Sequence, residues 1–326
     1  MTGNEPTRAL SVPARTIPVP TTVSPEAQAA LSMENPYAGH RQPDPNDKGA
    51  WVAHGQRANA AMTETLKARF VQNSSAHLAD HDLSNAKLYE ITPAGIPAGE
   101  ESKAILYIHG GGFTIGGGIA AAYAAYSIVD LAKLKIFSVD YRMPPHSPFP
   151  AGLDDAVEAY RHVLDRHRPE EIAVYGPSAG GGLAASFLLK ARDLGLPMPA
   201  ACVLHSPEAD LTEAGDSFET NNGIDGVLSR LTNSIALYAN GHDLRDPYLS
   251  PLYGDFSKGF PPTILTSGTR DLFLSNTVLM HRALRRAKIA AELHIWEAMG
   301  HAGFFGMAPE DREVLEEQVR FIRQSL

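Results

Sequence analysis

The sequence is poor in three features that would each assign it to a particular class of protein. Cys202 is the only cysteine among 326 residues, which excludes an internal disulfide and a metal site built from cysteines. Acidic residues outnumber basic ones, and the net charge of −9 lacks the basic excess typical of nucleic-acid-binding proteins. No apolar run approaches the length of a membrane span. We therefore expect neither a nucleic-acid partner nor a membrane span.

The N-terminus also lacks the arrangement of a secretory signal peptide, in which a basic stretch precedes an apolar one. Residues 1–20 are polar and rich in proline, so we expect the very start of the chain to be poorly ordered. Without an export signal, a cytoplasmic location is the default expectation. Cys202 lies in an apolar run and is expected to be a small buried hydrophobic residue.

Most of the chain alternates short β-rich apolar runs with helical patterns, which predicts a mostly parallel central sheet flanked by helices. We expect strands at 86–92, 103–109, 135–140, 172–176, 200–205, 262–267 and 291–297. We expect helices at 118–132, 150–166, 179–194, 275–287 and 310–324. In sheets of this kind, catalytic residues gather at the carboxyl ends of the strands.

Two further helices are expected before the first strand, at 27–33 and at about 48–70. Two helices cannot build a core of their own, so we expect them to pack over the active site as a lid. We therefore divide the chain into a cap of residues 1–80 and a catalytic domain of residues 81–326. The interruption at 206–261 contains a helical pattern at 227–238, and residues 206–240 are expected to add to the cap.

The pattern Gly-x-Ser-x-Gly, with Ser178 at its centre, stands where the strand at 172–176 gives way to a helix. This is the context of a nucleophile elbow, in which a tight turn exposes the serine. Side chains at Gly176 or Gly180 would collide with neighbouring backbone, and we expect a strained backbone at Ser178. The same five residues are also compatible with a turn that carries no chemistry, so the rest of the chain must decide.

An acid and a histidine follow two later strands in a suggestive order. Asp271 comes after the strand at 262–267, and His301 comes after the strand at 291–297. The order Ser178, Asp271, His301 predicts a relay in which the histidine takes the serine proton and the acid orients the imidazole. Taken singly, Asp271 is also compatible with a helix cap and His301 with a solvated loop residue.

A run of three glycines, 110–112, follows His109 at the end of the strand at 103–109. Such a loop lets backbone N–H groups converge on an oxyanion, together with the N–H of Ala179 at the start of the next helix. A flexible glycine linker is the alternative, but these glycines follow a buried strand rather than lying between domains. We interpret His109 as a residue that orients this loop and not as a base.

These motifs resemble those of the bacterial hormone-sensitive-lipase-like esterases of the α/β-hydrolase superfamily, from about residue 103 to the C-terminus. The matching stretches are 109–113, 141–142, 148–151, 154–156, 178–181 and 300–301 with Phe304. The resemblance implies the α/β-hydrolase fold with an N-terminal helical cap. The site residues that it implies are the nucleophile Ser178, the acid Asp271, the base His301 and the oxyanion donors Gly111, Gly112 and Ala179.

The activity implied by the resemblance is that of a serine carboxylic-ester hydrolase. It would act through an acyl-enzyme on uncharged esters with short or medium acyl chains, with no cofactor, and a homodimer is expected. A lactone or amide hydrolase with the same triad is an alternative, because the carbonyl group that the serine attacks in a lactone or an amide is like that of an ester. A non-catalytic small-molecule receptor on the same fold is a more distant one. A metal site at His77 and His81 has less support, because we expect that polar segment to be a solvated turn.

Four positions depart from the family pattern. Pro177 stands where the family usually has Asp or Thr before the serine. Leu272 and Ser275 stand where the family usually has Pro and a second acid. Glu208 stands where an aromatic residue is common, and we expect its side chain to be solvated near the mouth of the site.

Overall fold

The computed structural model describes residues 9–34 and 41–326 of the chain. Residues 1–8, for which we expect poor order, lie outside the described residues. Within the described residues, eight strands form one sheet in the order β1-β2-β4-β3-β5-β6-β7-β8. The strands are β1 His77–Asp82, β2 Lys87–Thr92, β3 Ala104–Ile108, β4 Lys135–Asp140, β5 Ile172–Pro177, β6 Ala201–His205, β7 Thr263–Gly268 and β8 Ala291–Trp296. The pairs β1–β2 and β2–β4 are antiparallel and the other pairs are parallel.

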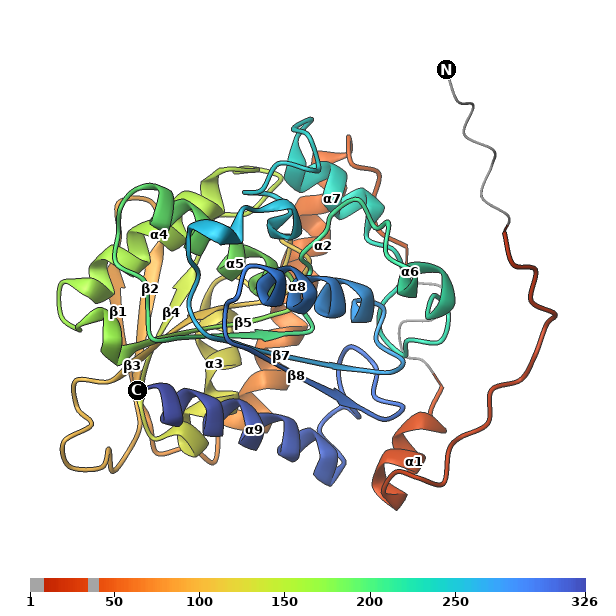
Figure 1. Ribbon diagram of the computed structural model, residues 1–326, viewed down its shortest axis with the longest axis horizontal. Coiled ribbons are helices and arrows are strands. Elements are labelled where there is room, and N and C mark those ends of the chain that lie inside the picture. The colour runs from red at the N-terminus through yellow and green to blue at the C-terminus, as the bar shows by residue number, and fades with distance from the viewer. Residues whose placement is uncertain (1–8, 35–40) are drawn as a thin grey trace.

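Helices cover both faces of the sheet (Figure 1). On one face lie α3 Ile119–Ala132 and α9 Pro309–Ser325, and on the other lie α4 Ala151–Leu164, α5 Ala179–Asp193 and α8 Leu274–Arg286. Strand β3 shows why both faces need cover, since all five of its residues are buried. Ile105 and Tyr107 contribute to the core beneath α3 and α9, whereas Leu106 and Ile108 contribute to the core beneath α4 and α5. The expected mostly parallel sheet flanked by helices is confirmed.

The remaining helices are shorter or lie outside these two layers. They are α1 Pro25–Leu31, α2 Lys48–Leu66 with a π-helical turn at Lys67–Val71, α6 Ser217–Thr220, α7 Thr232–Ala239 and 3₁₀ turns at Pro169–Glu171, Pro251–Tyr253 and Phe256–Lys258. Ser24 caps α1 by accepting a hydrogen bond from the backbone N–H of Ala27, and its own hydroxyl donates to Glu310 in α9. Helix α2 packs against α3. No helix in the described part of the chain combines the length and apolarity needed to cross a bilayer.

The interpretation of the segment around His77 and His81 as a solvated turn is wrong, because residues 77–82 form the edge strand β1. Its side chains lack a clear apolar alternation, which hid the strand from sequence analysis. Cross-strand pairs with β2 supply contacts instead: His81 Nε2 lies 2.8 Å from Glu90, and Lys87 Nζ lies 2.5 Å from Asp80.

Candidate active site

The turn between β5 and α5 holds Ser178 in a left-handed backbone conformation with φ 56° and ψ −130°. A Cβ atom on Gly176 would lie 2.3 Å from the carbonyl oxygen of Gly180, and one on Gly180 would lie 2.1 Å from that of Ile108. Only glycine fits at either position, as expected for an elbow this tight. The turn thus places Ser178 at the carboxyl edge of the sheet, directly before the N-terminus of α5.

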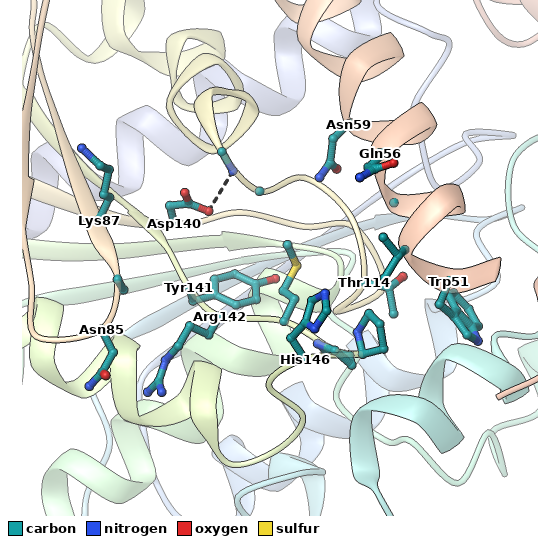
Figure 2. A pocket seen from close by; sticks show the side chains of 18 of the residues that line it. Trp51, Gln56, Asn59, Asn85, Lys87, Thr114, Asp140, Tyr141, Arg142 and His146 are labelled. Carbon is teal, nitrogen blue, oxygen red and sulfur yellow. Dashed lines mark hydrogen bonds between the residues drawn. The ribbon is translucent and has the colours of Figure 1, made fainter. Parts of the chain in front are cut away.

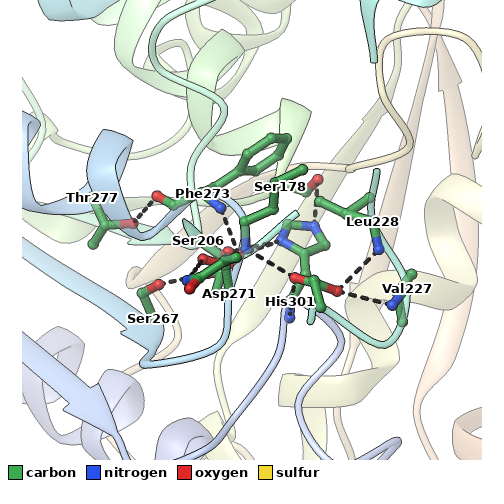
Figure 3. A network of polar contacts seen from close by, with 12 residues as sticks. Ser178, Ser206, Val227, Leu228, Ser267, Asp271, Phe273, Thr277 and His301 are labelled. Atoms are coloured by element: carbon green, nitrogen blue, oxygen red, sulfur yellow. Dashed lines mark hydrogen bonds and ion pairs between the residues drawn. The ribbon is translucent and has the colours of Figure 1, made fainter. Parts of the chain in front are cut away.

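The structure brings Ser178, Asp271 and His301 together from the ends of three parallel strands, β5, β7 and β8 (Figure 3). His301 Nε2 lies 2.8 Å from Ser178 Oγ, and His301 Nδ1 lies 3.2 Å from Asp271 Oδ1. Both distances suit a proton relay from the serine through the imidazole, whose charge the carboxylate would balance.

Asp271 is fully buried and surrounded by donors that favour its charged form. Its Oδ2 accepts hydrogen bonds from the hydroxyls of Ser206 and Ser267, and its Oδ1 accepts the N–H of Phe273 at 2.9 Å. Burial by itself raises the pKa of Asp271, but the hydrogen bond and charge of His301 and the two serine hydroxyls outweigh it, so the pKa is lowered. Asp271 is therefore a carboxylate at neutral pH.

The imidazole of His301 responds to the same pair of opposing effects. Burial by itself lowers the pKa of His301, because it disfavours the imidazolium. The hydrogen bond and charge of Asp271, with a smaller contribution from the charge of Asp225, reverse this effect, so the pKa is raised above its ordinary value of 6.5. A raised pKa strengthens the imidazole as a base toward Ser178.

Ser206, which sequence analysis did not single out, lies within the same network. Its Oγ lies 2.8 Å from His301 Nδ1 and also donates to Asp271. The residue is buried and has a positive φ of 48°. One available signal was its place: Ser206 directly follows β6, at the same edge of the sheet as the other polar residues.

Asp225 is a second residue of the site that sequence analysis missed. Its Oδ1 accepts the N–H groups of Val227 and Leu228, and its Oδ2 accepts those of Leu272 and His301. One buried carboxylate therefore joins three segments around the triad. Leu272 can take part because it has an N–H, which the proline usual at this position of the family lacks. These bonds hold 227–228 in a turn, so α7 begins at Thr232 and not at the expected residue 227.

The glycine loop after β3 lies against Ser178, since a Cβ atom on Gly110 would be 3.2 Å from Ser178 Cβ. Gly111 has a φ of 119°, and a Cβ there would lie 2.1 Å from the carbonyl oxygen of Ile115. Among the described residues, no group accepts a hydrogen bond from the N–H of Gly111, Gly112 or Ala179. These three N–H groups are thus free to donate to an anion that forms beside Ser178 Oγ.

His109 begins the glycine loop and is buried beneath it. Its Nδ1 lies 2.8 Å from the carbonyl oxygen of Gly110, and its ring stacks on Tyr141 with centroids 4.1 Å apart. The Tyr141 hydroxyl in turn donates to the backbone carbonyl of His109 at 3.0 Å. Burial lowers the pKa of His109 to about 4, so the ring is neutral at pH 7. Its place fits the predicted role in orienting the loop.

A cavity of about 630 Å³ opens beside Ser178 and His301, a size suited to a small organic ligand. Gly111 and Gly112 form part of its floor. Helix α2 supplies one wall, and residues of the segment 227–231 supply another. Helix α1 packs elsewhere, against α9. Its Ala27 and Ala30 belong to an apolar cluster with Ala298, Met299 and Phe304, and no residue of α1 lines this cavity.

Comparison with known proteins agrees with this architecture. Residues 105–305 match a family model described as the alpha/beta hydrolase fold. The chain belongs to the α/β-hydrolase-fold family. It is 33% identical over 232 residues to an acetyl-hydrolase of Streptomyces hygroscopicus, covering 70% of this chain and 77% of that protein. It is 30% identical over 241 residues to carboxylesterase NlhH of Mycobacterium tuberculosis, covering 68% and 73% of the two chains.

Solved structures extend the similarity of this α/β-hydrolase to nearly its whole length. Esterase E25 has a TM-score of 0.87 at 32% identity and covers 98% of this chain and 99% of its own. An esterase from the bacterial hormone-sensitive lipase family has a TM-score of 0.78 at 28% identity, covering 93% of this chain and 98% of its own. The resemblance to that family of esterases is confirmed.

Glu208 of this α/β-hydrolase corrects one expectation, because its side chain is buried rather than solvated. The backbone N–H of Glu208 donates to the carbonyl oxygen of Ser178 at 3.0 Å, which draws the segment under the elbow. Gly182 then packs so closely that a Cβ there would lie 2.1 Å from the Glu208 carbonyl oxygen. Neither carboxyl oxygen has a hydrogen-bond partner among the described residues. Burial, with a smaller effect from nearby Glu213, raises the pKa of Glu208 to about 8.

Proposed function

We propose that this α/β-hydrolase is a serine carboxylic-ester hydrolase that acts on esters with short to medium acyl chains. The observation that carries the proposal is the 2.8 Å contact between Ser178 Oγ and His301 Nε2, beside backbone N–H groups that have no acceptor in the described part of the chain. The relatives named as an esterase and a carboxylesterase support the choice of esters.

In the proposed mechanism, Ser178 Oγ attacks the ester carbonyl carbon while His301 Nε2 takes the hydroxyl proton. The N–H groups of Gly111, Gly112 and Ala179 stabilise the oxyanion, and Asp271 stabilises the imidazolium. His301 then gives the proton to the departing alkoxide, so the alcohol leaves and the acyl group stays bonded to Ser178 Oγ. In the second half, a water molecule attacks the acyl carbon while His301 Nε2 takes its proton. The bond from that carbon to Ser178 Oγ breaks, His301 returns the proton to Oγ, and the carboxylic acid leaves.

We further propose that α2, the longer of the two helices before β1, forms a cap over the cavity together with residues of 206–240, whereas α1 lies against α9. The wall formed by α2 and the contribution of Val227, Leu228 and Leu231 support this division. A cytoplasmic location and a homodimer stay predictions. Cell fractionation tests the first, and light scattering of the purified protein tests the second.

The test of the assignment is Ser178→Ala, assayed with a chromogenic short-chain ester and a fluorophosphonate label. We expect loss of labelling and a fall in turnover of at least about a thousandfold. Ser257→Ala is the matched control, because this exposed serine lies outside the site and its loss should leave both readouts unchanged. Retention of more than about a hundredth of wild-type turnover by the Ser178 variant would refute the role of this serine.

A further inference from the structure

The wall that α2 presents to the cavity changes character along the helix. His54 and Arg57 line the cavity toward the N-terminal end, whereas Ala58, Met62 and Leu66 line it toward the C-terminal end. At 1.5 Å per residue, His54 and Leu66 are separated by about 18 Å along the helix axis. A substrate that lies along α2 therefore meets basic groups at one end and apolar groups at the other.

The charge at the basic end has no counterpart among the described residues that line the cavity. Among the described residues that line the cavity, Arg57 is the one Arg or Lys, and no Asp or Glu is present. The Arg57 side chain is exposed, and no ion pair or hydrogen bond joins its guanidinium to another described residue. By contrast, Arg142 and Arg323 each bind a carboxylate of the protein. The guanidinium of Arg57 is thus available to a ligand in a chain whose net charge is −9.

A guanidinium offers paired N–H donors that match the two oxygens of a carboxylate, and such charge-assisted bonds exceed neutral ones in strength. Val227, Leu228 and Leu231, which also line the cavity, are apolar and offer no competing charge to a ligand. An uncharged ester offers no charge to this exposed cation, whereas an anionic substituent would form an ion pair with it.

We propose that the cavity selects esters that carry an anionic group, such as a carboxylate, which binds Arg57 while the apolar part lies along Met62 and Leu66. This substrate class differs from the uncharged esters that the family resemblance implies. The inference rests on the proposed esterase function and adds a specificity to it.

The experiment compares isosteric ester pairs that differ only in charge. Hydrogen glutarate and glutaramate esters of 4-nitrophenol place the carboxylate or its amide analogue on the acyl side. Butyrate esters of 3-hydroxybenzoate and 3-hydroxybenzamide place them on the alcohol side. For each pair, kcat/KM is measured for the wild type, Arg57→Gln and Lys67→Gln. Lys67 is the matched control, because it is an exposed cation that follows α2 but does not line the cavity.

We expect Arg57→Gln to lower kcat/KM for the anionic ester of at least one pair by roughly fivefold, the factor for a pair worth about 1 kcal/mol. The neutral ester should change by less than twofold, and Lys67→Gln should change neither. Salt at 0.5 M should reduce the difference. Equal losses on both members of each pair, or no loss on either, would overturn the anion specificity while leaving ester hydrolysis intact. Absence of wild-type turnover on every ester would instead refute the proposed function.

A second, independent observation concerns Asn59, which lies on α2 beside the glycine loop (Figure 2). Asn59 Oδ1 accepts the backbone N–H of Gly116 at 2.7 Å. Helix and loop are in close contact there, since a Cβ atom on Gly55 would lie 3.7 Å from the carbonyl oxygen of Thr114. A Cβ on Gly116 would lie only 2.6 Å from the carbonyl oxygen of Gly110, so the two ends of the loop are packed together.

We infer that Asn59 is a positioning residue, through which α2 holds the loop that carries the oxyanion donors. Gln56 offers a matched control, because it is exposed one turn earlier on α2 and lines the cleft of about 840 Å³ shown in Figure 2. Asn59→Ala should lower kcat about five- to tenfold, as expected for the loss of one hydrogen bond, with KM changed by less than twofold.

Asn59→Asp keeps an acceptor oxygen at the same place and should restore most of the lost kcat. Gln56→Ala should match the wild type. Thermal melting of the three variants shows whether each is folded under assay conditions. An unchanged kcat in a folded Asn59→Ala, or a change confined to KM, would overturn the positioning role. The same holds if Asn59→Asp, when folded, is as impaired as Asn59→Ala.

Discussion

Replacement of Glu208 by Gln should remove a loss in the free energy of unfolding that the wild type undergoes as pH rises. The Glu208 side chain is 1% exposed, and neither carboxyl oxygen has a hydrogen-bond partner among the described residues. Its pKa is raised from 4.5 to about 8, first by burial and then by the charge of Glu213. Between about pH 4.5 and pH 8, the folded protein therefore keeps a proton on Glu208 that the unfolded chain has released.

The magnitude follows from linkage between protonation and folding. Because the pKa of this acid is higher in the folded state, the unfolded chain binds fewer protons between pH 4.5 and 8, and stability falls as pH rises through that window. One pKa unit corresponds to 1.36 kcal/mol. The contribution of Glu208 to the free energy of unfolding should therefore fall by about 2 kcal/mol between pH 6 and pH 8.

The assay is denaturant-induced unfolding of wild type and Glu208→Gln at pH 6, 7 and 8. Gln has nearly the same size and polarity but does not ionise, so other titrating groups cancel in the difference between the two proteins. The advantage of the variant should grow by about 2 kcal/mol over this range. Glu297→Gln, at an exposed site, should show no such growth.

Parallel pH dependence of wild type and Glu208→Gln would refute this reasoning, because it would mean that Glu208 has the same pKa in both states. A variant that becomes less stable than wild type as pH rises would refute it more strongly. That result would mean that Glu208 is ionised in the folded protein and bound by a positive group.

Two further predictions concern catalysis. Activity should rise with pH as His301 loses its proton, and the midpoint in kcat/KM should lie above 6.5, because Asp271 raises the pKa of the imidazole. A midpoint below 6.5 in a pH–rate profile would contradict this electrostatic account. Gly111→Ala should lower kcat by about a hundredfold, because the new Cβ would meet the Ile115 carbonyl oxygen at 2.1 Å and displace an oxyanion donor. Steady-state kinetics measures this effect, and circular dichroism checks that the variant is folded. A kcat within twofold of wild type in a folded Gly111→Ala would contradict the prediction.

Much of the fold could be predicted from local patterns. The strands at 103–109 and 172–176 are largely apolar runs with glycine at their C-terminal ends, and their bounds lie within one residue of those of β3 and β5. The edge strand β1 could not be predicted in the same way, because charged pairs with β2 take the place of an apolar alternation and few of its side chains, such as Leu78, pack against the core. An edge strand is stabilised by pairing with its neighbour, and the hydrophobic periodicity within one segment does not reveal that pairing.

Some residues of the candidate site could likewise be predicted from local patterns, and others could not. Ser178, Asp271 and His301 can be identified from the sequence because each lies within five residues of the end of a strand, and parallel strands bring such places together. Ser206 and Asp225 have no comparable local mark. Their parts in the network depend on partners far along the chain, as in the contact between Ser206 and His301, which are 95 positions apart.

The sequence by itself determined the order of the strands from β2 onward and of the helices that flank them, the tight glycine elbow and the three residue types of the candidate triad. Each of these depends on residues that are neighbours in the chain. Only the tertiary structure decided that Glu208 is buried, that Asp225 joins three loops and that Arg57 lines the cavity, with neither Glu208 nor Arg57 paired through its side chain to another residue in the described ranges 9–34 and 41–326. Burial and pairing depend on which distant segments pack together, and no spacing within one segment encodes them.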